Sequence, residues 1–401
     1  MKQSRRSFLA SAAAATGALA TGGTASAAPA FIDLPMANGR RPLEKFPQKR
    51  EMIVQATRPP ILETPFSVFD GSELTPNDAH YVRWHLAGIP ESVDASTFQL
   101  KVGGLVNKSL SLSLAQLERD FPATEIVAVN ECSGNSRGYF SPRVPGGEWS
   151  NGGMSNARWR GVRLKDILAK AGIASGAKQV SFHGLDRGVI PATPQFTKAL
   201  DMDVAAGDDV IVAYAMNGQR LPLLNGFPLR LVVAGWFATY WVKMLSNIDV
   251  IDHVEDSFWM KTAYRIPDTP GNTVTPDQTG YPTIPINKLR VRSFITNVTD
   301  GERLKPGPQP IRGIAFDSGT GIKTVEFSSD GGTTWTAATL GRDLGRYSFR
   351  KWQTTWTPSG PNKFTLACRA ASNGGETQST VAVWNPSGYL RNNIETYQVN
   401  L

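Results

Sequence analysis

The chain is poor in cysteine, and the motifs that attach several common cofactors are missing from it. Its 401 residues include two cysteines, Cys132 and Cys368, and neither stands in a C-x-x-C or C-x-x-C-H context. Two isolated thiols cannot build a disulfide scaffold, and these contexts exclude a covalent c-type haem and a cysteine zinc cage. The sequence has no G-x-G-x-x-G turn and no βαβ rhythm, which argues against a nicotinamide or flavin dinucleotide.

Long apolar runs and long basic runs are also absent from the sequence. The apolar stretch near the N-terminus is too short and too rich in glycine to form a permanent membrane helix. The formal net charge is +8, and it becomes +5 without residues 1–27, which contain Lys2, Arg5 and Arg6 and no acid. Because the basic residues are scattered, we expect neither nucleic acid nor a membrane as partner, and the excess charge favours a local site for an anion.

The N-terminus has the pattern of an export signal. Ser4-Arg5-Arg6-Ser7-Phe8-Leu9 precedes a run of alanine, glycine and threonine that ends in Ala25-Ser26-Ala27. The paired arginines and the A-x-A site predict a twin-arginine signal peptide over residues 1–27 and a mature periplasmic protein. Proteins exported by this route fold before export, often around a cofactor, so the signal favours a bound cofactor.

The remaining chain divides into two predicted domains. Residues 28–75 are rich in proline and are predicted to be irregular, while helix patterns at 113–117 and 164–170 stand among short strand patterns. We therefore predict an α+β fold for residues 28–285, ending in a linker rich in proline and glycine from about 266. Short strands are expected after it, at 311–314, 325–327, 335, 347–349, 364–368 and 381–383. They predict an immunoglobulin-like β-sandwich over residues 286–401, assigned to dimerisation, with Cys368 in its core.

Cys132 lies in a turn of small and polar residues, Asn130-Glu131-Cys132-Ser133-Gly134-Asn135-Ser136-Arg137. Such a turn lets the backbone approach a bulky group closely, and the positive charge of Arg137 favours a thiolate. The thiol is therefore a candidate soft ligand for one metal ion. The alternative is a small buried hydrophobic residue without a chemical role.

Several segments of the first domain set charged residues among aromatic, apolar or glycine neighbours. They are 81–86, 184–186, 225–230, 241–243 and 258–265. Each could be a surface side chain that lies on its neighbours. Together they suit a ligand that carries a phosphate, a polar heterocycle and a metal-bound sulfur.

These segments resemble the sulfite oxidase family of molybdenum enzymes, and most closely a haem-free periplasmic bacterial sulfite dehydrogenase. The most specific matches are the turn 132–137, Asn217-Gly218-Gln219-Arg220-Leu221-Pro222, Gly226-Phe227-Pro228-Leu229-Arg230 and Val242-Lys243. The resemblance implies that Cys132 is the protein thiolate on the molybdenum of a molybdopterin cofactor, and a soft thiolate suits that metal.

The resemblance also implies which residues contact the cofactor and the substrate. The cofactor contacts are Tyr81, Val82, Arg83, Trp84, His85, Asp186, Asn225, Arg230, Trp241, Val242 and Lys243. The catalytic residues are Arg83, Arg137 and Tyr264, which meet the oxyanion, His85, which tunes the charge of the pocket, and Arg391. Asn225 stands where animal members have histidine. Animal and plant members carry an arginine in Trp-Asn-Leu-Arg-Gly, where this chain reads Trp384-Asn385-Pro386-Ser387-Gly388, so Arg391 is expected to reach the anion from four residues later.

The implied activity is oxidation of sulfite to sulfate by oxygen-atom transfer. Because this chain has no haem motif, a separate c-type cytochrome is expected to take the electrons singly, and the sandwich is expected to pair two chains. Two alternatives within the family stay open, a sulfane dehydrogenase and a sulfoxide reductase, although the C-terminal sandwich argues against the second. A cofactor-free periplasmic binding module is the alternative from another class.

Overall fold

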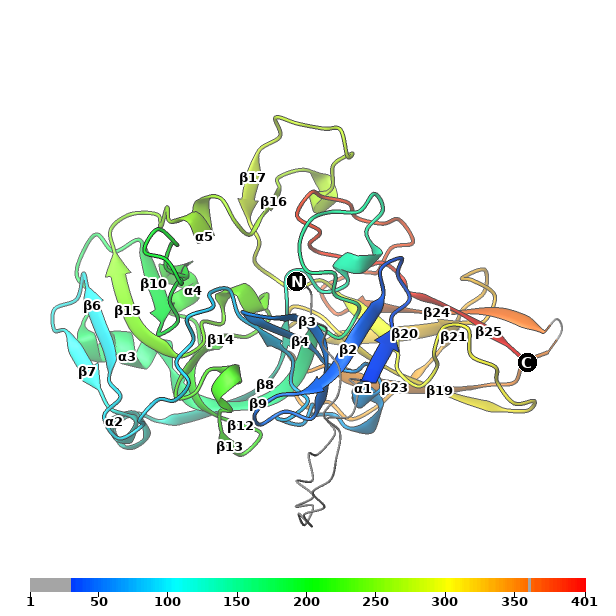
Figure 1. Ribbon diagram of the computed structural model, residues 1–401, viewed down its shortest axis with the longest axis horizontal. Helices are drawn as coiled ribbons and strands as arrows, with labels where there is room; N and C mark the ends of the chain where they lie inside the picture. Colours follow the sequence, from blue (N-terminus) through cyan, green and yellow to red (C-terminus); the bar gives the residue numbers. More distant parts are fainter. Residues whose placement is uncertain (1–29, 360–361) are drawn as a thin grey trace, which may run out of the picture.

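The computed structural model describes residues 30–359 and 362–401, and the predicted signal peptide lies outside these residues (Figure 1). Most of the described chain forms short strands, with few helices. A mixed α+β domain is followed by a β-rich domain, as the sequence predicts. The two domains lie at opposite ends of the long axis in Figure 1.

The N-terminal segment forms an antiparallel sheet, so the prediction of an irregular region over 28–75 is wrong. Its strands, in spatial order, are β1 (Ala30–Asp33), β2 (Arg40–Lys45), β3 (Glu51–Thr57), β4 (Pro60–Glu63) and β5 (Val82–Arg83). Pro60 opens β4, a position at which a strand tolerates proline. Met52, Ile53 and Val54 are all buried, which hides the alternation expected of a strand.

Two further sheets form the body of the first domain. One has the order β11-β10-β15-β6-β7, and its members are β6 (Leu100–Gly104), β7 (Leu110–Leu112), β10 (Gln179–Gly184), β11 (Thr197–Asp201) and β15 (Leu245–Ile251). The other has the order β13-β12-β9-β8, with β14 beside β12, and its members are β8 (Ala123–Glu131), β9 (Met154–Arg163), β12 (Val210–Met216), β13 (Gln219–Arg220) and β14 (Arg230–Val233). Cys132 directly follows β8, and Arg230 begins β14.

The two predicted helices are confirmed. Helix α2 (Leu114–Asp120) begins with a capping box, in which the Ser113 hydroxyl accepts from the Gln116 backbone N–H and the Gln116 side chain accepts from the Ser113 N–H. Helix α3 (Leu164–Ala171) buries one apolar face against the sheet. The remaining α-helices are single turns, α1 (Val68–Gly71), α4 (Met202–Ala205) and α5 (Phe258–Lys261).

The predicted linker contains structure of its own. Strand β16 (Arg265–Pro267) pairs with β17 (Thr283–Pro285), and the loop between them projects from the body (Figure 1). A short 3-10 turn, η4 (Pro270–Asn272), lies within that loop. The connection is therefore a paired ribbon at its base.

The second domain consists of two four-stranded sheets. One is β18 (Arg292–Ile295), β19 (Gln309–Phe316), β23 (Arg350–Trp356) and β22 (Thr339–Leu340). The other is β21 (Thr336–Ala337), β20 (Ile322–Ser328), β24 (Lys363–Ser372) and β25 (Thr396–Asn400). The strands predicted at 311–314, 325–327 and 364–368 are confirmed.

Two other predicted strands in this domain are wrong. At 347–349 the apolar residues face the first domain, because the Tyr347 hydroxyl donates to Asp209 at 2.6 Å and its backbone bridges to Ala128, so β23 begins only at Arg350. The residues 381–383 form a loop, in which Val381 is 74% exposed. The last strand of the sheet is β25 instead.

The main hydrophobic core is shared by the two domains. Phe294, Phe316 and Phe349 of the second domain pack with buried residues of the first, such as Trp159 and Phe182. A second core lies between the two sheets of the C-terminal domain and includes Cys368, which is fully buried as predicted. The shared core fixes the C-terminal domain against the domain that carries Cys132.

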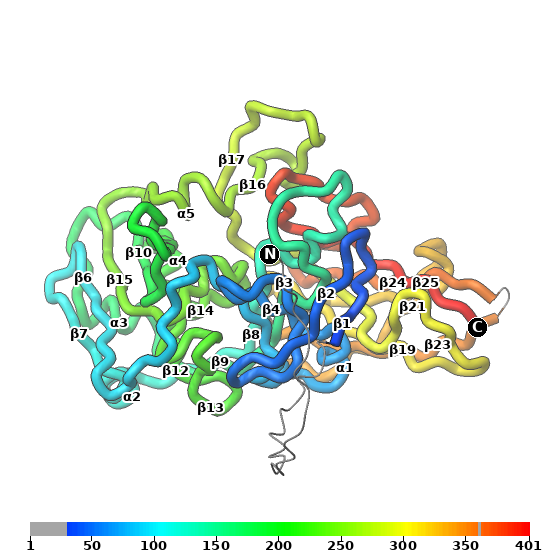
Figure 2. The backbone as a smooth tube through the Cα atoms, viewed as in Figure 1, coloured from blue at the N-terminus to red at the C-terminus, as the bar shows by residue number. Residues whose placement is uncertain are grey.

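The C-terminal segment returns to the first domain. Figure 2 shows the chain after β24 running beside the loop that follows β8, and the Trp384 indole donates to the Pro142 carbonyl at 2.8 Å. This return brings the segment around Ser387 close to Arg137.

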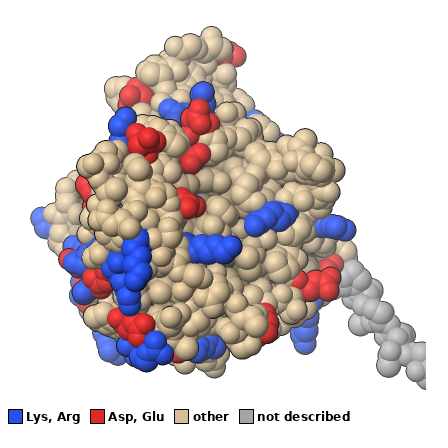
Figure 3. All heavy atoms as spheres, turned by 90° about the vertical axis from the view of Figure 1, so that its left-hand side faces the viewer, with Lys and Arg blue, Asp and Glu red and all other residues tan. Residues whose placement is uncertain are grey.

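The described residues contain no helix that is long and apolar enough to span a membrane. On the face seen in Figure 3, basic and acidic side chains are scattered among neutral ones.

Candidate cofactor and substrate site

A narrow cleft with about 380 Å³ of empty space lies in the first domain. Its walls are formed by Tyr81, Arg83, His85, Cys132, Ser133, Leu224, Asn225, Arg230, Ala238, Thr239, Lys243 and Tyr264. All of these except Ser133, Leu224, Ala238 and Thr239 are predicted site residues. The fold therefore brings together most of the residues that the sequence singled out, from segments far apart in the chain.

The turn that carries Cys132 is held rigidly at the end of β8. The Cys132 N–H donates to the Gly153 carbonyl at 2.9 Å, and the Asn135 side chain donates to Glu131 at 3.0 Å. A Cβ on Gly134 would lie 2.4 Å from the Arg137 guanidinium, so the guanidinium packs closely against this glycine. Cys132 is only 8% exposed but lines the cleft, which fits a ligand better than a packed core residue.

The second domain supports the same turn from behind. Arg292, the first residue of β18, donates to Glu131 at 2.7 Å and to the Ser136 hydroxyl at 2.9 Å, and it also pairs with Glu395 at 3.3 Å. All of these side chains are buried or nearly so. Because a buried ion pair loses its stabilisation when one partner is removed, this cluster ties the position of the Cys132 turn to the second domain.

One end of the cleft is rich in buried positive charge. Arg230 donates to the Asn225 carbonyl at 3.1 Å and to the Asn130 side chain at 3.0 Å, and Lys243 lies over the Trp84 ring at 4.6 Å. Burial lowers the pKa of Arg230 to about 10 and that of Lys243 to about 7. Within the described residues neither cation forms an ion pair with a carboxylate. Buried charges without a counter-ion are costly, so this end is suited to an anionic ligand.

Polar atoms without protein partners line the same cleft. The hydroxyls of Ser133 and Thr239 and the Nε of Arg230 are buried and make no hydrogen bond to the described residues. Buried polar groups in native proteins nearly always have partners, so these atoms indicate a polar ligand.

Protein residues alone do not supply a metal cage. Among residues 30–359 and 362–401, no group of three or more His, Cys, Asp or Glu side chains could hold a metal ion. A metal bound to Cys132 would therefore take its other ligands from a bound organic group. The cleft with its sulfur, its cations and its unpaired polar atoms fits a molybdopterin with a bound molybdenum.

The side chain of Asn225 is bound to protein groups. Its oxygen accepts a hydrogen bond from Lys49, and its nitrogen donates to the Tyr81 carbonyl at 3.1 Å. Lys49 is not among the predicted site residues. The predicted contact between Asn225 and the cofactor stays a prediction, while the structure shows that Asn225 holds neighbouring wall residues.

The other end of the cleft is aromatic. The His85 ring stacks on Phe196 with ring centroids 3.8 Å apart, and Trp259 packs edge-on at 5.1 Å. Burial, followed by the charges of Arg83, Lys243 and Lys198, holds the pKa of His85 well below its usual range, so the imidazole is neutral. His85 Nε2 forms a hydrogen bond with the Tyr264 hydroxyl.

Tyr264 is held in an uncommon backbone conformation. Its φ of 60° lies in the left-handed region, which residues other than glycine rarely adopt. Burial raises the pKa of its hydroxyl, so the group stays protonated at neutral pH. The constrained backbone and the bond to His85 together aim a protonated hydroxyl into the cleft.

Two of the three arginines predicted to bind the oxyanion, Arg83 and Arg137, differ in position. Arg83 lines the cleft and donates to the Trp84 carbonyl at 3.2 Å. Arg137, in the turn η1 (Arg137–Tyr139), donates to the Ser387 and Gly147 carbonyls at 3.1 and 3.2 Å. Its guanidinium lies 5.2 Å from the ring of Tyr389, which is absent from the predicted set and stacks on Tyr264 at 5.7 Å. Arg137 therefore stands behind the aromatic end and is not part of the cleft wall.

Arg391 is not brought to the cleft. It pairs with Glu395 at 3.2 Å, and its guanidinium lies 5.3 Å from the Tyr139 ring. It thus belongs to the buried cluster of Arg292 and Glu395 that supports the Cys132 turn from behind. Its contact with the substrate stays a prediction that this arrangement does not favour.

The other predicted cofactor contacts form the layer behind the walls. Val82, Trp84, Trp241 and Val242 are buried in the core, and their assignment as contacts stays a prediction. Asp186 is also buried and acts on the charge of Lys243, while burial raises the pKa of its own carboxyl.

A second buried lysine near the aromatic end was also missed. Lys198 of β11 is fully buried, donates to the Trp259 carbonyl at 2.8 Å, and lies over the rings of Tyr240 and Tyr264. A usable signal exists in the sequence, because Lys198 stands between apolar residues that are also buried, Phe196 just before β11 and Leu200 within it. A lysine at a buried position of a strand indicates polar partners inside the fold, because a buried charge is costly without them.

Comparisons with known proteins agree with this site. The family model described as "Oxidoreductase molybdopterin binding domain" matches residues 85–259, and the one described as "Mo-co oxidoreductase dimerisation domain" matches residues 283–400. The first range includes Cys132, Arg230 and Lys243 but leaves out Arg83 and Tyr264.

Individual relatives extend the similarity to most of the chain. The mitochondrial sulfite oxidase of Macaca fascicularis is 36% identical over 84% of this chain, which spans 64% of the length of that enzyme. The sulfite oxidase of Gallus gallus is 33% identical over 86% of this chain and 77% of its own length. The crystal structure of the sulfane dehydrogenase SoxCD from Paracoccus pantotrophus superposes with a TM-score of 0.75 at 26% identity, covering 86% of this chain and 85% of that chain.

Proposed function

Because the chain belongs to the sulfite oxidase family of molybdenum oxidoreductases, we propose that it oxidises sulfite to sulfate with a molybdopterin cofactor. The observation that carries the proposal is the position of Cys132, on the wall of a cleft that has unpaired buried cations at one end and a His85–Tyr264 pair at the other. When bound, the molybdenum–molybdopterin group supplies the oxygen-atom transfer and takes up two electrons.

Different residues of the cleft would bind different parts of the cofactor. The Cys132 thiolate would bind the molybdenum, and Arg230 and Lys243 would neutralise the anionic end of the pterin. The free hydroxyls of Ser133 and Thr239 offer hydrogen bonds to its polar atoms. The protein thereby orients the group and excludes water around it.

The aromatic end would bind and polarise the substrate. Arg83 supplies a guanidinium for the sulfite oxygens, and the Tyr264 hydroxyl, held by neutral His85, donates a hydrogen bond near the reacting oxygen. Sulfite and one water give sulfate, two protons and two electrons.

The electrons would leave singly to a c-type cytochrome, and two chains would pair through the C-terminal domain. The match of residues 283–400 to a dimerisation domain supports the homodimer. The paired arginines and the A-x-A site within residues 1–27 support export to the periplasm by the twin-arginine route.

Oxidation of carrier-bound sulfane sulfur is the second candidate function. Two observations favour it: the structural similarity to the sulfane dehydrogenase SoxCD, and the single arginine, Arg83, that lines the substrate end of the cleft. Membership of the family removes the cofactor-free binding module from consideration.

The test is sulfite-dependent reduction of cytochrome c by the purified holoenzyme, with molybdenum measured in each preparation. Cys132→Ser should lose almost all activity because serine does not replace the soft thiolate. Cys368→Ser is the matched control, since Cys368 lies in the core of the other domain. Equal rates per chain in the parent and in Cys132→Ser would contradict the proposal, and oxidation of a sulfane-bearing carrier without oxidation of sulfite would favour the second candidate.

A further inference from the structure

Lys49 is a buried cation next to the cofactor cleft that no prediction named. It lies between β2 and β3, is 7% exposed, and donates from Nζ to the carbonyls of Asn77 and His80 at 2.8 Å each and to the Asn225 side chain. Asp78, the nearby carboxylate, is paired with the exposed Arg50 at 2.7 Å. Within the described residues, Lys49 itself has no carboxylate in ion-pair contact.

The contacts of Lys49 lead directly to the cationic end of the cleft. Asn225, which accepts from Lys49, donates to the Tyr81 carbonyl at 3.1 Å and offers its own carbonyl to Arg230 at 3.1 Å. Tyr81, Asn225 and Arg230 all line the cleft. Lys49 therefore fixes three wall residues through one side chain, although its own three donors are occupied by protein acceptors.

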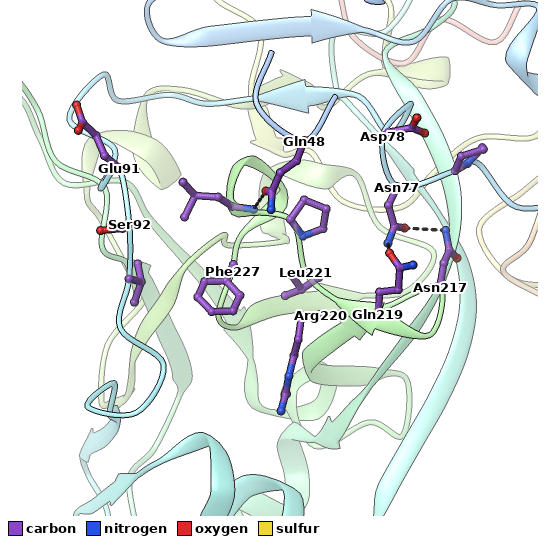
Figure 4. A pocket seen from close by; sticks show the side chains of 14 residues that line it. Gln48, Asn77, Asp78, Glu91, Ser92, Asn217, Gln219, Arg220, Leu221 and Phe227 are labelled. Carbon is purple, nitrogen blue, oxygen red and sulfur yellow. Dashed lines mark hydrogen bonds between the residues drawn. The ribbon is translucent and has the colours of Figure 1, made fainter. Parts of the chain in front are cut away.

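The backbone holds Lys49 in this inward direction. Gln48 has a φ of 59°, in the left-handed region, and its side chain accepts from the Leu223 N–H at 2.9 Å. Figure 4 shows Gln48, Asn77 and Asp78 on the wall of a separate open cleft with about 1370 Å³ of empty space. One residue of this wall, Asn77, accepts a hydrogen bond from Lys49 through its carbonyl.

The charge on Lys49 needs an anion nearby. Burial lowers the pKa of Lys49 to about 7, and the charge of Arg230 adds to this shift, while the charge of Asp78 opposes it. Arg230 and Lys243 are two further cations of the same end. Neither forms an ion pair with a carboxylate in the described chain, and Asp186 acts on Lys243 without ion-pair contact. An anion bound there would compensate all three charges at once.

We propose that Lys49 is a positioning residue for the anionic end of the molybdopterin, acting through Asn225 and Arg230 and adding a third buried positive charge. The N-terminal sheet is thus part of the cofactor site, although it precedes residues 85–259, which match the cofactor-binding family model. The inference depends on the cofactor and not on sulfite as the substrate.

The test measures bound cofactor in three variants of the full chain. Each is produced with the parent in a host that makes molybdopterin, and molybdenum per chain and pterin fluorescence after denaturation are measured before and after extended dialysis. Lys49→Met should retain about tenfold less of both than the parent, as expected when a supporting partner of a bound group is removed. Lys49→Gln keeps hydrogen-bond donors without the charge and should also lose cofactor, whereas Lys49→Arg should restore retention to within about twofold of the parent.

Arg50→Gln is the matched control, because Arg50 is the exposed neighbour of Lys49, and it should retain cofactor as the parent does. If Lys49→Gln retains as much cofactor as the parent, the proposed role of the Lys49 charge is wrong. The Lys49→Gln variant alone tests the proposal if Lys49→Met does not fold. Sulfite oxidation per bound molybdenum should stay unchanged in the loaded fraction of each variant. A parent that binds molybdenum but does not oxidise sulfite would contradict the proposed function and leave the inference on Lys49 standing.

Discussion

The two ends of the cleft are built on different principles. At the cationic end, Arg230 and Lys243 line the cleft and Lys49 lies next to it. None of the three forms an ion pair with a carboxylate in the described chain, and polar atoms beside them lack partners. At the aromatic end, formed by His85, Phe196, Trp259 and Tyr264, the rings pack against one another and the polar atoms of His85 and Tyr264 bond each other. The cationic end is incomplete without its ligand, whereas the aromatic end is already organised.

This difference matches the residence time of the two ligands. A cofactor that stays bound can compensate buried charges permanently, so the fold can leave them without internal partners. A substrate that binds and leaves in every turnover requires a site that keeps its geometry while empty. We therefore expect the cationic end to determine cofactor retention and the aromatic end to determine the rate of the chemical step.

The largest expected effect comes from breaking the cationic end. Arg230→Met should abolish retention of the cofactor, because the guanidinium is buried and central to this end, and activity should disappear with the molybdenum. Tyr264→Phe is the counterpart at the aromatic end, and it should keep the parent amount of molybdenum while kcat falls about tenfold through the loss of one hydrogen bond. Molybdenum analysis and steady-state kinetics on both variants measure the two effects separately.

The distinction between the two ends is wrong if Arg230→Met and Tyr264→Phe have the same molybdenum content. Loss of molybdenum from Tyr264→Phe would show that the aromatic end also holds the cofactor. Full molybdenum content in Arg230→Met would show that the unpaired cations serve another purpose.

A smaller effect is expected in the pH dependence of stability. It concerns Lys198, the buried lysine near the aromatic end. Burial lowers the pKa of Lys198 to about 7 from its ordinary value of 10.5, with Arg265 adding to the shift. Between these two pH values the unfolded chain binds a proton that the folded chain does not bind, so stability rises with pH across this range. Groups that face Lys198 include the rings of Tyr240 and Tyr264 and the Trp259 carbonyl.

Lys198→Met should flatten this rise, and thermal unfolding of the holoenzyme from pH 7 to 10 measures it. The holoenzyme isolates the contribution of Lys198, because the bound anion should keep Lys49 and Lys243 protonated. Lys261→Met is the control, since the Lys261 side chain is 70% exposed and should leave the slope as in the parent. An unchanged slope in Lys198→Met would mean that the lysine is not the group that titrates.

The sequence predicts best those parts of the site that are local in the chain. Each of these parts is a short motif of neighbouring residues. They are the Cys132 turn, with glycine at the point where Arg137 approaches, and the segments around Arg230 and Lys243. Lys49 carries no such signal, because its bond to Asn225 spans 176 positions and its neighbours resemble an ordinary surface turn. The strand at 347–349 was mispredicted for a related reason, since contact with the first domain keeps this apolar run out of the sheet.

The same limit applies to the arginines, since residue spacing does not reveal which of them reaches the cleft. The sequence predicts contact with the oxyanion for both Arg83 and Arg391, yet Arg83 lines the cleft and Arg391 pairs with Glu395. The charge of Arg391 is therefore already compensated by a carboxylate in the cluster that also contains Arg292. Only the folded arrangement distinguishes a cation available to an oxyanion from one that is not.

The smallest expected effect is that of Arg391→Ala on substrate binding. The KM for sulfite should change by less than about threefold, because Glu395 keeps its partner Arg292 at 3.3 Å when Arg391 is removed. Arg83→Ala should raise the KM by about tenfold or more with its molybdenum content unchanged, since a charge-assisted contact to the anion is lost. Steady-state kinetics on both variants at one ionic strength measure the difference. A KM raised equally in both variants would show that Arg391 leaves Glu395 and reaches the anion during turnover, and the aromatic end would then share its substrate with the cluster behind Cys132.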